Sequence, residues 1–352
     1  MLSFLFRRLV PGLLFLTLLS CLPGRLAAEL VWSPSTGWRI EGGVLAGLGG
    51  PEGRNALELM NKGRLAEERG STGSALSSYG KVAKKYPNSV YAPEALYRSG
   101  KLRLVRVQYF AAFMAFQQLV ARYPNTKRFN EVIGEQYRIA SNLLDGKRSR
   151  VWGLFPGFTS RSTAIGYFEV ILANAPYSDY APLCLMNIAR AHQQRKETDE
   201  AIDALDRLIN TYPQSLLTAD AYYKLAQTHA SLVDGPYYDQ ASTKESVTYY
   251  EDFMILFPND VNLGKAAQGL DGMKKMLAES KMKMADFYFY KRDNYLAARV
   301  FYNEAITAYP DSDVAKRAKV QLAKVEAKAA GKPTPHVEPG QPKPKKKRFW
   351  LF

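Results

Sequence analysis

Cysteine and histidine are scarce in this chain of 352 residues, which has two cysteines and three histidines. Cys21 and Cys184 are too few for the multi-disulfide framework that holds small secreted domains together. The histidines, His192, His229 and His336, are far apart in the sequence, and none lies in an HExxH motif. We therefore expect neither a metal site nor an internal disulfide framework.

Catalytic signatures are absent as well. The sequence has no GxSxG motif, no CxxC pair and no glycine-rich phosphate loop after a strand. Gly42-Gly43 and Gly49-Gly50 are not followed by the lysine pattern of a P-loop. The sequence predicts a protein that is not an enzyme and that uses no cofactor.

The amino-terminal apolar run is too short to span a membrane. Residues 9–20 are mostly apolar but are interrupted by Pro11-Gly12, whereas a membrane span needs about 20 residues. Because basic residues precede the run, residues 1–28 are typical of an export signal. Two processing routes are open: lipidation of Cys21, which follows Leu18-Leu19-Ser20, or cleavage after Ala28. Both routes predict export from the cytoplasm of a bacterium.

The chain also lacks a clustered basic face. Its formal net charge is +15, but part of this excess belongs to the leader and to the tail that begins at Lys332. Nucleic-acid binding needs Lys and Arg gathered on one side of the fold, and no such stripe is present in the body. We therefore expect no nucleic-acid partner.

What the chain does contain is an internal repeat, in which an aromatic or small residue precedes a proline and a short polar stretch. The prolines are Pro87, Pro124, Pro176, Pro213, Pro258 and Pro310. The twelfth residue before each proline is small: Ala75, Ala112, Ala164, Ala201, Ser246 and Ala298. The eighth is aromatic or leucine: Tyr79, Phe116, Phe168, Leu205, Tyr250 and Tyr302. A fixed internal period of this kind indicates a repeat array.

Each repeat is expected to be a pair of helices. The small residue lets two backbones approach, the aromatic residue fills the remaining space, and the proline ends the second helix. Ser89, Thr126, Ser178, Ser215 and Ser312 then lie at or just ahead of the start of the next helix. Further small residues, Gly63, Gly100, Ala189 and Ala285, fall near 24 positions before a proline. The pattern resembles the tetratricopeptide repeat, which implies an all-α, right-handed helical solenoid of about six helix pairs.

The sequence divides into four parts: a signal peptide (residues 1–28), an extended arm with a glycine-rich link (29–53), the repeat array (54–328) and a disordered basic-aromatic tail (329–352). Trp32 and Trp38 of the arm either cover the first repeat or dock on a partner. The aromatic residues of an insertion in the third repeat either pack on neighbouring repeats or present a contact surface. The basic-aromatic end of the tail suits an anionic membrane surface or a partner protein, or it is a solvated charge run with no specific role. The candidate contact residues are Trp152, Phe155, Phe158, Lys345, Lys346, Lys347, Arg348, Phe349, Trp350 and Phe352.

Repeat solenoids bind extended peptides on the concave surface lined by the first helix of each pair. The repeat spacing places six residues on that surface. These candidates for a peptide groove are Arg64, Glu67, Tyr97, Lys101, Arg190 and Gln193.

Residues 54–324 also resemble the BamD family of outer-membrane assembly lipoproteins. The resemblance rests on Asp239-Gln240-Ala241, Phe257-Pro258-Asn259, the helix through Met276-Leu277-Ala278, the run from Met284 to Tyr290, and Tyr309-Pro310-Asp311-Ser312. It implies a non-catalytic scaffold at the periplasmic face of the outer membrane, lipid-anchored or soluble. Its implied partners are extended segments of unfolded outer-membrane proteins and the periplasmic domains of the barrel-forming insertase.

An alternative is a periplasmic scaffold like the cell-division coordinator associated with the Tol-Pal system, which shares Tyr-Pro-Asn-Ser followed by Tyr91-Ala92-Pro93-Glu94-Ala95. Those proteins carry a coiled coil ahead of their repeats, and residues 29–50 here are too short and too rich in glycine for one.

Overall fold

The structure of the protein is a computed structural model that describes residues 29–41, 50–151, 155–157, 161–236 and 240–331. Cys21, Trp152, Phe158 and the tail from residue 332 lie outside the described residues. The predictions made for them therefore stay predictions.

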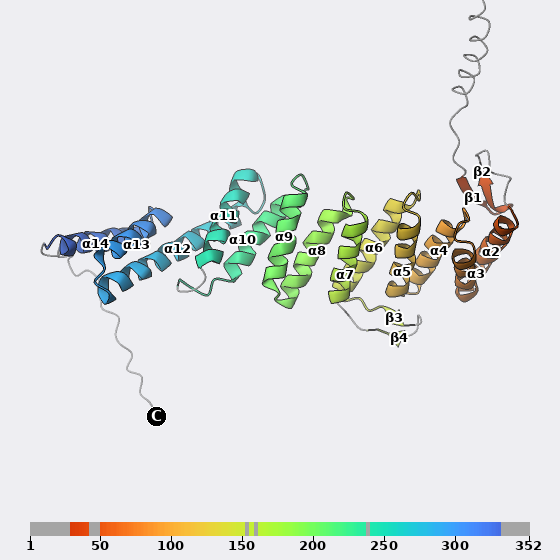
Figure 1. Ribbon diagram of the computed structural model, residues 1–352, viewed down its shortest axis with the longest axis horizontal. Helices are drawn as coiled ribbons and strands as arrows, with labels where there is room; N and C mark the ends of the chain where they lie inside the picture. Colours follow the sequence, from red (N-terminus) through yellow and green to blue (C-terminus); the bar gives the residue numbers. More distant parts are fainter. Residues whose placement is uncertain (1–28, 42–49, 152–154, 158–160, 237–239, 332–352) are drawn as a thin grey trace, which may run out of the picture. The chain divides into compact units, whose positions relative to one another are not determined.

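The described residues form thirteen α-helices and two small antiparallel sheets (Figure 1). The strands are β1 (Glu29–Ser33), β2 (Gly37–Glu41), β3 (Arg150–Val151) and β4 (Phe155–Pro156). The helices are α2 (Pro51–Glu68), α3 (Thr72–Lys85), α4 (Ala92–Val105), α5 (Tyr109–Arg122), α6 (Phe129–Leu144), α7 (Arg161–Asn174), α8 (Tyr180–Arg195), α9 (Thr198–Thr211), α10 (Thr218–Ser231), α11 (Gln240–Leu256), α12 (Leu263–Lys291), α13 (Tyr295–Ala308) and α14 (Asp313–Ala329). The all-α array of six helix pairs is confirmed, and α14 is one further helix after the sixth pair.

The chain divides into two compact units, Met1–Ala181 and Pro182–Phe352. In unit 1, α2 packs on α3, α3 on α4, α4 on α5, and α6 on α7. In unit 2, α9 packs on α10, and each helix from α10 to α13 packs on the next one. Each unit is thus held together by contacts between neighbours in the sequence, as expected for stacked repeats.

The first two pairs pack a glycine of the first helix against an aromatic ring of the second. A Cβ atom placed on Gly63 would lie 2.6 Å from the Tyr79 ring, and one placed on Gly100 would lie 2.4 Å from the Phe116 ring. Both rings are completely buried. The small and aromatic positions of the repeat are therefore partners across the helix pair.

At three junctions, the side chain of the polar residue after the proline accepts a hydrogen bond at or near the start of the next helix. Ser312 is the N-cap of α14, and its Oγ accepts a hydrogen bond from the Ala315 amide at 3.0 Å. At two earlier junctions the residue lies two positions ahead of the N-cap: Thr126 Oγ1 accepts from the Arg128 amide at 3.4 Å, and Ser215 Oγ accepts from the Leu217 amide at 3.2 Å. These bonds hold the tight turn between repeats.

The segment that the sequence predicted to be an extended arm contains a β-hairpin, in which Trp32 pairs with Trp38. Gly37 closes the turn with φ +70°, a backbone conformation that favours glycine. The Trp38 amide donates to Asn61 Oδ1 of α2 at 2.9 Å, and the Trp38 side chain joins the core of the first repeat with Met60. The hairpin therefore packs on the first repeat.

The insertion in the third repeat is fixed at its base. β3 pairs with β4, and the Arg150 amide donates to the Val107 carbonyl at 2.8 Å. The Tyr109 amide donates to Ser149 Oγ at 3.1 Å. The base of the insertion is thus hydrogen-bonded to the turn between α4 and α5.

Candidate functional site: a charge ladder on the first helices of unit 1

Ion pairs join the first helices of the three repeats in unit 1, α2, α4 and α6. We call five of the residues concerned the charge ladder: Glu67, Glu94, Arg98, Arg128 and Glu131. Arg98 contacts Glu67 at 3.4 Å and Glu94 at 3.0 Å. Arg128 contacts Glu94 at 2.8 Å and Glu131 at 2.9 Å. The acidic and basic groups alternate across the three helices, so each arginine bridges two carboxylates.

A second set of contacts runs beside the charge ladder. Lys101 Nζ lies 2.6 Å from Glu135 Oε1, and Arg138 pairs with the same carboxylate. The Tyr97 hydroxyl donates to Glu131. Each of these links joins α4 to α6 or lies within α6, so the first helices are tied together by polar groups as well as by the apolar core.

Aromatic rings cover the cations of this face. The Arg64 guanidinium lies 4.3 Å from the centroid of the Trp32 ring, and the Arg98 guanidinium lies 5.0 Å from the Trp38 ring. Arg128 lies 4.2 Å from the Tyr97 ring. Cation–π contacts of this kind add about 0.5–1 kcal/mol each at exposed sites. The two tryptophans of the hairpin therefore pack on arginines at the amino-terminal end of the surface that carries the charge ladder. We call this surface the ladder face.

Two tyrosines that contact the charge ladder, and the ladder residue Glu131, have shifted pKa values. Burial raises the pKa of Tyr97, and the hydrogen bond to Glu131 raises it further. Burial also raises the pKa of Tyr79, whose hydroxyl donates to Glu67 at 2.9 Å. Burial alone would raise the pKa of Glu131, but hydrogen bonds from Tyr97 and Arg128 outweigh it and the pKa is lowered.

The structure brings four of the six groove candidates together. Arg64 and Glu67 on α2 form an ion pair at 3.4 Å, and Tyr97 and Lys101 on α4 both contact residues of α6. Tyr97 is only 8% exposed, so it supports the face more than it offers a free surface. The other two candidates lie on α8 in unit 2, where Gln193 donates to Thr228 of α10 at 3.0 Å and Arg190 is exposed.

Sequence reasoning missed most of the ladder. Glu94, Arg98, Arg128, Glu131 and Glu135 were not among the candidates. A usable signal was present, because Glu94–Arg128, Tyr97–Glu131 and Lys101–Glu135 are each pairs of complementary groups 34 residues apart. Residues one repeat apart occupy equivalent positions on neighbouring helices, so such a spacing predicts contact.

Most contact residues predicted in the insertion and the tail lie outside the described residues. These are Trp152, Phe158, Lys345, Lys346, Lys347, Arg348, Phe349, Trp350 and Phe352, and only the backbone of Phe155 is described, in β4. In the part of the chain that the structure covers, no helix has the length and apolar character of a membrane span. The same part holds no cluster of residues that could bind a metal ion.

Two family models match this chain. Residues 159–332 match the model of the YfiO family, described as outer membrane lipoprotein. Residues 59–89 and 94–126 match a tetratricopeptide-repeat model.

Curated relatives point the same way. The outer membrane protein assembly factor BamD of Rickettsia prowazekii is 32% identical over 142 residues, which are 40% of this chain and 56% of that protein. BamD of Caulobacter vibrioides is 27% identical over 135 residues, which are 38% of this chain and 44% of that protein. The chain thus spans about half the length of the curated relatives it matches.

Among solved structures, MamA from Desulfovibrio magneticus is 18% identical with a TM-score of 0.30, over 60% of this chain and 99% of that one. The assignment of the fold therefore rests on the helix pairs themselves and on the matched repeat model.

Proposed function

This chain is a BamD-like tetratricopeptide-repeat protein, and from that premise we propose that it acts as a non-catalytic scaffold in the assembly of outer-membrane β-barrel proteins. It works at the periplasmic face of the bacterial outer membrane. It binds extended segments of unfolded outer-membrane proteins and docks on the insertase. The observation that carries the proposal is the match of residues 159–332 to the outer membrane lipoprotein family.

We assign client binding to the ladder face of unit 1. An extended peptide has unpaired backbone N–H and C=O groups, and a face of alternating carboxylates and guanidinium groups can satisfy both kinds. The formal charges of the charge ladder and its neighbours Arg64, Lys101, Glu135 and Arg138 nearly balance. Such a face recognises the peptide backbone without selecting strongly for one net charge.

We assign docking on the insertase to the last helix pair in unit 2. Its helices expose large apolar side chains: Phe287 at 46%, Tyr290 at 55%, Leu296 at 68% and Val300 at 47%. Apolar side chains gathered on one helix pair are typical of a protein interface. The elements involved, α12 and α13, lie within the matched family region.

Depletion of the protein in its own bacterium tests the overall role. We expect the amounts of folded β-barrel proteins in the outer membrane to fall while inner-membrane proteins stay constant, as quantified by mass spectrometry of membrane fractions. Unchanged barrel levels together with a division defect would instead favour the Tol-Pal type of scaffold. Mass spectrometry of the mature amino terminus distinguishes a lipidated Cys21 from cleavage after Ala28.

Client binding is tested with Lys101→Ala. Lys101 is the cation of this face that can be removed with least damage, because Glu135 keeps its partner Arg138. We expect the variant to fold normally and to bind a peptide from the end of an outer-membrane barrel about two- to fivefold more weakly, the effect of one partly exposed charge. The matched control is Lys81→Ala on α3, an exposed lysine outside the ladder. Equal binding by the two variants would remove the ladder face as the client site.

A further inference from the structure

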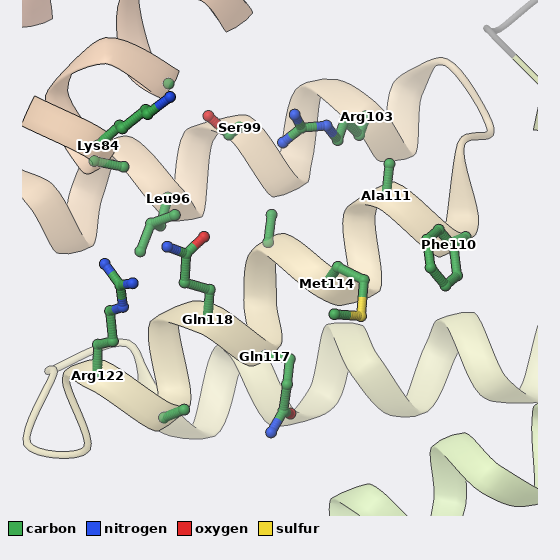
Figure 2. A pocket seen from close by; sticks show the side chains of 14 residues that line it. Lys84, Leu96, Ser99, Arg103, Phe110, Ala111, Met114, Gln117, Gln118 and Arg122 are labelled. Carbon is green, nitrogen blue, oxygen red and sulfur yellow. The ribbon is translucent and has the colours of Figure 1, made fainter.

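A groove of about 780 Å³ lies between α3, α4 and α5 in unit 1 (Figure 2). Its lining includes Lys84 of α3, Leu96 and Arg103 of α4, and Phe110 and Arg122 of α5. No residue of the charge ladder lines it, since the ladder uses other positions of α4. The groove is therefore a second surface, separate from the proposed client site.

The groove carries positive charge without a counter-charge. Three of its fourteen lining residues are cations, Lys84, Arg103 and Arg122, and none is acidic. Within the described residues, no salt bridge reaches any of the three. Each lies in the last turn of its helix, where the helix dipole favours a cation by about 0.3–1 kcal/mol. The helix dipoles therefore explain why cations occupy these positions. Each cation can still pair with a carboxylate of a bound partner.

Burial disfavours the charged form of one of these cations, Arg103. Burial lowers the pKa of Arg103, which means that its charged form is poorly solvated. An arginine keeps its charge in any protein environment, so an anion bound at the site would offset the lost solvation.

Apolar side chains also line the groove. Phe110 is 64% exposed and Met114 is 48% exposed, and their spacing of four residues puts them on one face of α5. Leu96 is 4% exposed and forms part of the lining. Figure 2 shows Lys84 and Arg122 toward one end of the groove, and Arg103 and Phe110 toward the other. The groove thus has cations toward both ends and apolar side chains along its lining.

The dimensions match one short helix. Lining residues on α5 run from Phe110 to Arg122, which at 1.5 Å per residue is about 18 Å, or roughly three helical turns. We propose that this groove binds an amphipathic helix of a partner protein, with carboxylates near both ends and large apolar side chains between them. Helices that lay an apolar stripe into a groove are a common mode of recognition.

Two other occupants fit less well. The chain's own tail carries Lys345, Lys346 and Lys347, so the cations of the groove would repel it. An anionic membrane surface offers the right charge, but a flat surface contacts the rim and not Leu96, which is almost completely buried. Charge and shape together favour an acidic helix.

The test uses the full chain and a synthetic 14-residue peptide with glutamates in its first and last turns and leucines spaced three and four apart. Fluorescence anisotropy gives its affinity, and a peptide with lysines in place of the glutamates is the reference. We expect Lys84→Glu and Arg103→Glu each to weaken binding about tenfold, because a charge reversal replaces attraction with repulsion. Phe110→Ser tests the apolar lining, with the exposed Val105, which lies outside the groove, changed to serine as its control.

Lys85→Glu is the matched control for charge. Lys85 follows Lys84 in the last turn of α3, so the helix dipole acts on both lysines, but Lys85 does not line the groove. We expect it to change the affinity less than about twofold, the scale of one exposed charge. Circular dichroism checks that each variant is folded.

Four results would overturn the proposal. Equal losses in Lys84→Glu and Lys85→Glu would mean a diffuse charge effect. Equal binding of the glutamate and lysine peptides would remove the charge complementarity, and a gain in affinity on deleting residues 332–352 would identify the tail as the occupant. Binding to phosphatidylglycerol vesicles that depends on Lys84, with no binding of the acidic peptide, would assign the groove to a membrane.

Discussion

The α4–α6 junction of unit 1 and the α8–α10 junction of unit 2 each connect two successive first helices, but by different chemistry. In unit 1, groups 34 residues apart pair as ions, as Lys101 does with Glu135 at 2.6 Å. In unit 2, the corresponding contact is neutral, from the Gln193 amide to the Thr228 hydroxyl at 3.0 Å, 35 residues along the chain. Unit 2 also has ion pairs between its later helices, such as Lys281 of α12 with Glu304 of α13 and Arg317 of α14 with Glu279 of α12, both at 2.7 Å.

The same repeat template thus supports two kinds of polar contact on the first helices, one charged and one neutral. The buried small and aromatic positions are shared by both units, so the packing does not decide which polar groups lie on the first helices. The charge ladder makes the unit 1 face sensitive to salt and pH, because ion pairs are screened and carboxylates titrate. The neutral contact of unit 2 responds to neither. The family comparisons divide at a similar place, with the generic repeat model in unit 1 and the outer membrane lipoprotein model from residue 159.

The largest expected effect comes from adding a methyl group at Gly100, where the helix backbone packs directly against the Phe116 ring. Gly100→Ala places a Cβ atom 2.4 Å from a fully buried ring, and overpacking of this kind costs about 1–3 kcal/mol. Hydrogen exchange should show lost protection in α4 and α5, while unit 2 keeps its protection. Gly166→Ala is the control, because nothing lies within 4 Å of the place that its new Cβ atom would occupy and alanine favours a helix by about 0.5–1 kcal/mol. If both alanines stabilise the protein, close approach is not what holds the pairs of unit 1.

An effect of similar size is expected from neutralising the centre of the ladder. Glu94 is 8% exposed and accepts hydrogen bonds from both Arg98 and Arg128. Glu94→Gln leaves the two guanidinium groups without their shared charge, and we expect a loss of about 1.5–3 kcal/mol, the range for hydrogen bonds to charged groups.

Thr228→Val makes the comparison with unit 2. It removes the neutral contact with Gln193 and should cost about 1 kcal/mol. Raising the salt concentration should shrink the cost of Glu94→Gln and leave the cost of Thr228→Val unchanged, as followed by hydrogen exchange in each unit. Equal salt responses would mean that the charge of the ladder does not distinguish the two faces.

The helix pairs could be predicted from the sequence because each rests on local rules. Pro87 cannot continue a helix, and Ala75 and Tyr79 lie on one face of the helix before it, so the second helix of the repeat follows from spacing alone. The burial of both residues is complete. The hairpin could not be predicted in the same way, because Trp38 is fixed by Met60 and by the Asn61 side chain, which are contacts between distant residues.

The candidate site was only half predicted for a related reason. Repeat spacing correctly puts Arg64, Glu67, Tyr97 and Lys101 on the first helices, but it says nothing about which partner each one takes. The partner of Lys101 is Glu135, one repeat away, and only a comparison of charges at equivalent positions of successive repeats reveals it. The groove between α3, α4 and α5 was not predicted at all, since its cations come from the ends of three helices with no shared motif.

The smallest expected effect is a pH dependence at the end of the ladder. The pKa of Glu131 is lowered from its ordinary value of 4.5 in the folded protein, because the hydrogen bonds from Tyr97 and Arg128 outweigh the burial. A carboxyl with a lowered pKa stabilises the fold above its unfolded pKa, and this stabilisation is lost as the pH falls through the folded pKa. Glu131→Gln should therefore be less stable than the parent at pH 7, by less than about 1 kcal/mol because the pair is partly exposed. The difference should vanish in acid, below the lowered pKa.

Gln193→Ala in unit 2 supplies the contrast, because neither Gln193 nor its partner Thr228 titrates between about pH 3 and pH 8. Its cost should be the same at both ends of that range when protection is measured in α8 and α10. A Glu131→Gln difference that persisted unchanged in acid would show that Glu131 acts through packing or shape alone. The charge of Glu131 would then contribute nothing to stability. The two units would differ only in which side chains make their contacts and not in how those contacts respond to pH.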